Sequence, residues 1–187
     1  MDSARLMLED TIISEITSED ALNLINSKVQ INELTIRGAD SDGLDFDFSH
    51  GLINNIYFSN IGNDALDFSG LRVSVKDFTG EYIGDKAISV GEASSITLKT
   101  SAKKNSRFGL VSKDSSELVA SGVFLDNISV GLLAYNKKEE FDGGTITFEG
   151  TFGDRVDQQA AVESGSSITM NGEKLNISHS KIAEYIY

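Results

Sequence analysis

Acidic residues recur at a fixed interval in the first half of this chain. Asp20, Asp42 and Asp64 are each separated by 22 residues, and Lys86 follows at the same interval. A second series begins three residues later and consists of Asn23, Asp45, Asp67 and Ser89, with Asp47 and Asp85 close to it. If residues one interval apart stand above one another, neighbouring carboxylates lie about 4.8 Å apart, where like charges repel by about 1 kcal/mol even in water. Such columns require water, a cation or Lys86 to stabilise them.

Three interpretations of these acidic columns are open. The first is a solvated acidic face on which aspartate side chains cap turns. The second is a calcium site formed by Asp42, Asp45, Asp64 and Asp67, because oxygen ligands from stacked turns suit a hard cation. The third is polysaccharide chemistry by Asp42 and Asp64 with Lys86, since glycoside hydrolysis needs a carboxylic acid and a base on either side of a sugar bond.

Residues beside the columns are candidates for binding a partner. Asp45, Asp67 and Asp85 are expected to contact a partner through the acidic face. Tyr57 is expected to point outward and to offer its ring to a sugar. The two histidines, His50 and His179, have no periodic partner, so no catalytic triad and no histidine-rich metal site can be assembled. No cofactor is expected to be required, and calcium is the one ion that the columns suggest.

The architecture that positions these residues is indicated by a repeated dipeptide. A small residue followed by Leu or Ile occurs at intervals of 22: Ala21-Leu22, Gly43-Leu44, Ala65-Leu66, Ala87-Ile88, Gly109-Leu110 and Gly131-Leu132. A fixed period in the range of about 20–50 residues is the signature of a stacked-repeat protein. A further column at the same interval is predicted for Ile12, Leu34, Ile56 and Phe78.

Within each repeat, short runs alternate between apolar and polar residues, as in Leu44 to Phe48 and Leu71 to Val75. This alternation predicts short strands with one face inward, and Gly, Asn, Asp and Ser at the junctions predict turns. Leucine-rich repeats, helical repeats and left-handed hexapeptide helices have different periods or composition. We therefore predict an all-β fold, a right-handed parallel β-helix (β-solenoid) of about seven coils of 22 residues.

The chain is predicted to form a single β-helix domain over residues 1–187. Residues 1–19 are assigned to a partial N-terminal coil, 20–136 to regular coils, 137–159 to a loop-rich irregular coil, and 160–187 to the last coil and a C-terminal cap. The next small-apolar copy, near Ala160-Ala161-Val162, comes about 30 residues after Gly131, which places extra length in loops. The apolar tail from Ile182 to Tyr187 is expected to fold over the last coil as a lid. Asp2, Arg5 and Glu9 are the charged residues available to protect the opening coil from edge pairing.

Composition limits the partners. The formal net charge of −13 argues against nucleic acid and against adhesion to anionic membranes. The chain has no Cys, which excludes disulfides and thiolate metal sites. No apolar run reaches the length of a membrane span, and the first residues lack the layout of a signal peptide.

We expect no membrane insertion, and glycan or protein partners on the loops and the acidic face. The opening coil also raises the hypotheses of a larger parent protein or an end-to-end assembly.

Two resemblances bear on function. The segments Asp40-Ser41-Asp42-Gly43-Leu44-Asp45 and Gly62-Asn63-Asp64-Ala65-Leu66-Asp67 resemble the catalytic-aspartate strands of polygalacturonase-type glycoside hydrolases, which are right-handed β-helices of the pectate-lyase-like superfamily. That resemblance implies Asp42 and Asp64 as the acids. Where the family has Gly-His-Gly, this chain has Gly84-Asp85-Lys86, and where the family has Arg-x-Lys it has Val111-Ser112-Lys113.

The second resemblance covers residues 40–144. The segments "IGNDALDFSG", "GDKAISVGEASSI", "GLVSKDSSEL" and "GLLAYNKKEEFDGG" resemble β-helix regions of bacterial surface or secreted proteins that accompany spore-coat-kinase-like or lamin-tail-like modules. It implies an extracellular or cell-surface setting in bacteria. The function expected is therefore a non-catalytic, carbohydrate-associated structural or binding module. The alternative is a polysaccharide-active hydrolase or a lyase/epimerase-like enzyme that uses the acidic columns.

Overall fold

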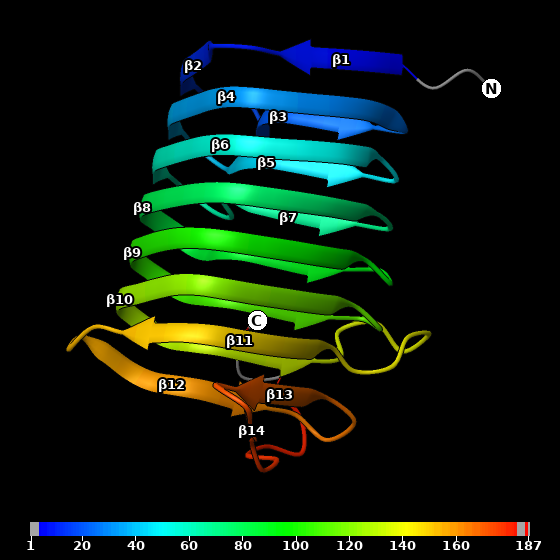
Figure 1. The fold of residues 1–187 in the computed structure, drawn as a ribbon, viewed down its shortest axis with the longest axis vertical. Coiled ribbons are helices and arrows are strands. Elements are labelled where there is room, and N and C mark those ends of the chain that lie inside the picture. The colour runs from blue at the N-terminus through cyan, green and yellow to red at the C-terminus, as the bar shows by residue number, and fades with distance from the viewer. Residues whose placement is uncertain (1–3, 183–185, 187) are drawn as a thin grey trace.

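The computed structural model describes residues 4–182 and 186 of the chain. The strands wind into one rod in which each turn lies beneath the previous one (Figure 1). The rod makes about seven turns with a repeat of about 22 residues. The strands are β1 (Ala4–Leu8), β2 (Thr11–Ile16), β3 (Asp20–Ile25), β4 (Ser27–Ala39), β5 (Asp42–Asp47), β6 (His50–Ile61), β7 (Leu66–Ser69), β8 (Arg72–Gly91), β9 (Ser95–Lys113), β10 (Glu117–Tyr135), β11 (Thr145–Phe152), β12 (Val156–Val162), β13 (Ser167–Met170) and β14 (Glu173–Lys174).

Parallel pairing between successive turns generates the rod. One side stacks the strands in the order β1, β4, β6, β8, β9, β10, β11 and β13. The opposite side stacks β3, β5 and β7, then the C-terminal parts of β8, β9 and β10, and finally β12. The chain winds in a right-handed sense (Figure 1), as connections between parallel strands nearly always do. The predicted all-β, right-handed parallel β-helix is confirmed.

The predicted vertical register is present in the column of inward-facing aliphatic residues. Leu22, Leu44, Leu66, Ile88, Leu110 and Leu132 are aligned strand to strand without interruption. The column continues to Ala160, which pairs with Leu132, as the sequence predicts. Two excursions take up the extra length between these two residues: the loop over residues 136–144 and the turn over 153–155.

The core runs along the axis of the rod. Phe46 and Phe68 meet edge to face with ring centroids 6.0 Å apart, and Phe58 and Phe78 do the same at 5.6 Å. All four rings are almost completely excluded from solvent. Edge-to-face aromatic pairs add about 0.5–1.5 kcal/mol to the burial of each ring, so these stacks hold the N-terminal turns together.

One predicted column is wrong at its first member. Leu34, Ile56 and Phe78 are aligned, but Leu34 pairs with Thr11, and Ile12 is 66% exposed. The step between β2 and β4 is one residue longer than the repeat, and it aligns Ile13 with Ile36. The longer step turns Ile13 toward the core, against which it packs, and leaves Ile12 outside.

The two ends of the rod differ. At the C-terminal end β14 turns back to pair with β13 in antiparallel fashion, and Leu175 packs against the core. Ile182 and Ile186 do not lie across this end; they pack on the outer side of the rod against Phe108, Val111, Leu133, Tyr135 and Ala161. The other tail residues of the predicted lid, like Asp2 in the opening coil, lie outside the described residues. In the part of the chain that the structure describes, no helix has the length and apolar character needed to cross a bilayer.

Candidate functional site

The aspartate columns occupy one side of the rod. The aspartates of β3, β5 and β7, with Asp64 in the turn between β6 and β7, form what we call the acidic face: Asp20, Asp42, Asp45, Asp47, Asp64 and Asp67. Asp20 is aligned with Asp42. Asn23, Asp45, Asp67 and Ser89 are aligned in the second column. The structure therefore brings these predicted site residues together, as the interval of 22 requires.

Asp42 and Asp64 perform the same structural task in successive turns. Asp42 Oδ1 accepts a hydrogen bond from the backbone N–H of Asp64 at 2.8 Å and another from Asn63 Nδ2 at 2.7 Å. Asp64 Oδ1 accepts one from the backbone N–H of Lys86 at 3.0 Å. Burial raises the pKa of Asp42 despite these bonds. Each carboxylate thus ties its own turn to the next one.

Lys86 is the centre of a buried ion cluster with Asp64 and Asp85. Its Nζ lies 3.3 Å from Asp64 Oδ1 and 3.4 Å from Oδ2, and it also donates to Asp85 Oδ2. Asp64 is 4% exposed and Lys86 is 3% exposed. Burial raises the pKa of Asp64 to about 6, against the opposing effect of the Lys86 charge. Arg107 Nη1 approaches the other oxygen of Asp85 at 3.6 Å, so the cluster contains two cations and two carboxylates.

The negative charges of Asp45 and Asp67 are less well balanced by nearby hydrogen-bond donors and cations than the charge of Asp64. Burial raises the pKa of Asp45 to about 7, and repulsion by Asp47 and Asp67 adds to this shift. Asp67 Oδ1 is buried without a hydrogen bond and lies 3.9 Å from Lys113 Nζ, which donates to Ser89 Oγ at 2.7 Å. The acidic face therefore ends at the buried Lys113. Beyond this lysine lies the apolar surface on which Ile182 and Ile186 pack.

Calcium was one interpretation of Asp42, Asp45, Asp64 and Asp67. Within residues 4–182 and 186, no group of three or more His, Asp or Glu side chains is arranged to hold a metal ion. The Asp64 carboxylate is engaged by a lysine ammonium instead.

The raised pKa of Asp45 predicts how the stability of the folded chain depends on pH. Its pKa in the folded chain, about 7, lies above the ordinary value of 3.8, so between these values the folded state binds more protons than the unfolded state. Stability then falls as the pH rises through this window. We expect a higher thermal midpoint near about pH 5.5 than near about pH 7.5, measured by circular dichroism. Asp45→Asn should raise the midpoint at the higher pH and shrink the difference.

Asp154→Asn, which removes the same charge from an exposed turn at the other end of the rod, is the matched control. If Asp45→Asn and Asp154→Asn change the pH dependence equally, the effect comes from net charge and not from the environment of Asp45.

Tyr57 lies away from the acidic face. It is half-buried on β6, with the Arg37 guanidinium 5.9 Å from the centre of its ring. Together with Glu33, Asn55 and Asp77 it lines a pocket of about 240 Å³ on β4, β6 and β8. Tyr57 and the aspartates of the acidic face therefore do not form one site.

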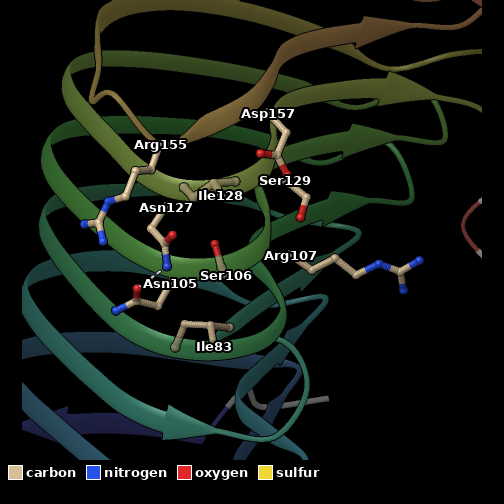
Figure 2. A pocket seen from close by; sticks show the side chains of 9 residues that line it. All are labelled: Ile83, Asn105, Ser106, Arg107, Asn127, Ile128, Ser129, Arg155 and Asp157. Carbon is tan, nitrogen blue, oxygen red and sulfur yellow. Dashed lines mark hydrogen bonds between the residues drawn. The ribbon is translucent and has the colours of Figure 1, made fainter.

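A second pocket was not anticipated from the sequence. It has a volume of about 340 Å³ and lies where β8, β9 and β10 bend, beside the start of β12 (Figure 2). We call it the polar pocket, and it is lined by Ile83, Asn105, Ser106, Arg107, Asn127, Ile128, Ser129, Arg155 and Asp157.

Asparagines stacked on successive turns organise the polar pocket. Asn127 Nδ2 donates to Asn105 Oδ1 one turn away, and both residues have positive φ, 53° and 60°, a conformation that asparagine tolerates well. In Figure 2 the two amides lie one above the other, with Ser129 near Asp157 on the adjoining turns. Arg155 Nη2 is held by Asp126 Oδ2 at 2.7 Å. The 22-residue spacing of Asn105 and Asn127 is the sequence signal that could have revealed this pocket.

Comparison of the chain with protein families, with characterised proteins and with solved structures finds no match.

Proposed function

We propose that this chain is a non-catalytic β-solenoid module of a bacterial surface or secreted protein, and that it binds glycan in the polar pocket. The observation that carries the proposal is the set of amide, hydroxyl, guanidinium and carboxylate groups presented to solvent by successive turns at one bend of the rod. The surface setting rests on the sequence resemblance of residues 40–144.

The chemistry of the polar pocket suits sugar hydroxyl groups, which both donate and accept hydrogen bonds. The amides of Asn105 and Asn127 offer donors and acceptors, Arg155 offers donors only, and Asp157 offers acceptors only. Because turns of a β-helix are about 4.8 Å apart, equivalent groups recur along the rod at a regular spacing. An extended, repeating ligand can therefore contact several turns in the same way.

The state of the two predicted catalytic acids supports a non-catalytic role. Asp42 is used to hold the backbone N–H of Asp64, and Asp64 is buried against Lys86. A general acid or base must come within hydrogen-bond reach of the substrate proton. Asp64 and Lys86 reach one another and not the solvent.

The proposal predicts a loss of glycan affinity when the asparagine ladder is removed. Asn127→Ala deletes one hydrogen-bonding amide and the contact that positions Asn105, so we expect binding to weaken by about tenfold. The measurement is calorimetric titration with neutral and uronic-acid oligosaccharides. Asn54→Ala is the matched control, because Asn54 donates to Asn32 at 2.9 Å in a similar ladder outside the polar pocket. Equal affinities of the two variants, or no binding by the unaltered chain, would reject the assignment.

One observation favours the enzymatic alternative. A carboxylic acid whose pKa is about 7, as for Asp45, is suited to protonate a leaving group near neutrality. Aligned carboxylates such as Asp45 and Asp67 would then act as acid and base. The test is release of reducing ends or unsaturated sugars from a polysaccharide panel. Our proposal expects none, whereas turnover that is abolished by Asp45→Asn or by Asp64→Asn would establish the alternative.

A further inference from the structure

The ion cluster around Lys86 is unlike the other ion pairs of the described residues. The side chains of Lys86 and Asp64 are 4% and 5% exposed, and that of Asp85 is 16% exposed. By contrast, the Lys138–Glu92 pair is 40% and 26% exposed, and the Lys76–Asp77 pair is 65% and 38% exposed. Taking an ammonium or a carboxylate out of water is unfavourable for each ion. The cluster therefore holds two oppositely charged groups in an environment that favours their neutral forms.

Lys86 Nζ is held close to both oxygens of the Asp64 carboxyl group. It lies at nearly the same distance from the two carboxyl oxygens, 3.3 and 3.4 Å. The backbone N–H of Lys86 donates to Asp64 Oδ1 and fixes the orientation of that carboxyl group. Two groups held together in this way gain a large effective concentration for a reaction between them.

We propose that Lys86 and Asp64 become joined by an intramolecular amide bond between Lys86 Nζ and Asp64 Cγ. In this step the C–N bond forms and one C–O bond of Asp64 breaks. Two protons of the Lys86 ammonium leave with that oxygen as one molecule of water. The ammonium charge and the carboxylate charge disappear together, and no oxidant, reductant or further reactant is consumed.

Asp85 is placed to carry the proton. Its Oδ2 accepts from Lys86 Nζ, so it can take a proton from the ammonium and return it to the departing oxygen of Asp64. Its Oδ1 is buried without a hydrogen bond and faces the Arg107 guanidinium at 3.6 Å. Arg107 keeps a positive charge beside Asp85, which offsets the negative charge that Asp85 retains when it is unprotonated.

A second buried lysine, Lys113, shows what the reaction requires. Lys113 is 7% exposed, yet its Nζ donates to the Ser89 hydroxyl, and its carboxylate neighbour, Asp67, lies 3.9 Å away. Of these two lysines, only Lys86 contacts two carboxyl groups, those of Asp64 and Asp85. The bond would link two successive turns of the rod covalently, at the point where the acidic face ends. This inference is independent of glycan binding.

Intact mass spectrometry of the purified full chain under denaturing conditions tests the proposal. We expect the chain to be lighter than its sequence by the mass of one water molecule. Proteolytic digestion should yield one branched peptide that contains both Lys86 and Asp64. Lys86→Met should restore the full sequence mass, Asp85→Asn should slow or abolish the loss of water, and Lys113→Met should keep it.

Two results would overturn the proposal. One is the full sequence mass for the unaltered, folded chain, a result that needs no variant to fold. The other is a loss of water that digestion assigns to a linear peptide, such as a cyclised Asp42-Gly43 or Asp142-Gly143, two sequences of the type that lose water within the backbone.

Discussion

Replacing Phe68 with alanine is expected to lower the free energy of unfolding by about 3–5 kcal/mol. Phe68 is completely buried and stacks between Phe46 of the turn before it and Val90 of the turn after it. The substitution leaves a cavity on the axis of the rod and removes the edge-to-face contact with Phe46. Because each turn of a solenoid contacts only its neighbours, the cavity weakens the connection between the N-terminal turns and the remaining ones.

Denaturant unfolding followed by circular dichroism measures this loss. Phe48→Ala is the matched control: Phe48 is the same residue type and lies in the turn before, but it is 60% exposed, so a change below about 1 kcal/mol is expected. Similar losses in the two variants would contradict the placement of Phe68 in the core.

Gly84→Ala is expected to destabilise the rod by about 3 kcal/mol or more. A Cβ at this position would lie 2.0 Å from the carbonyl oxygen of Gly62 in the turn above, and a Cβ on Gly62 would lie 2.1 Å from the carbonyl oxygen of Asp40. The obstructing atoms belong to the backbone, so neither contact can be relieved by rotating a side chain. The two turns must move apart at the corner that carries Asp64 and Asp85.

Thermal unfolding of Gly84→Ala and Gly172→Ala gives the comparison. Gly172 has φ of +85°, but no atom lies within 4 Å of the place that a Cβ would take, so its replacement should cost only the left-handed backbone term of about 1–2 kcal/mol. A smaller effect at Gly84 than at Gly172 would mean that the turns are not packed as closely as described.

The fold could be predicted because its main determinant is periodic. The spacing of Leu44, Leu66 and Ile88 places residues 22 apart on one vertical line, and the structure aligns them. The same spacing aligns the aspartates. Ile12 departs from this pattern because the first turn has one additional residue, and a change of one residue moves a side chain to the other face of a strand.

The state of each site residue depends on packing that no interval encodes. The sequence predicts Asp64 and Lys86 as neighbours, but it does not predict that both are almost completely buried or that Arg107 approaches Asp85 beside them. Ile182 and Ile186 pack on an apolar surface that includes Val111, Leu133 and Ala161. These three residues continue the outward-facing column that contains Asp45 and Asp67 in the earlier turns. Alternation alone predicts that they point outward into solvent. The polar pocket depends on where the long strands bend, and the positions of such bends are only weakly indicated by the sequence.

The vertical register of the turns is the claim on which the polar pocket, the acidic face and the Lys86–Asp64 bond all depend, and disulfide trapping tests it directly. The chain has no Cys, so a pair of introduced cysteines is the only one present. Leu52 and Ser74 are aligned on adjacent turns and point away from the core. The distance between the Cα atoms of aligned residues, about 4.8 Å, is within the range that a disulfide spans.

We expect the variant that combines Leu52→Cys with Ser74→Cys to form an intramolecular disulfide readily under mild oxidation, as measured by thiol titration and peptide mapping. The variant that combines Leu52→Cys with Lys76→Cys moves one partner two residues along the strand, to a Cα separation of about 8 Å, and should remain reduced. Efficient bridging of the second pair, with none in the first, would contradict the register and every proposal that rests on it.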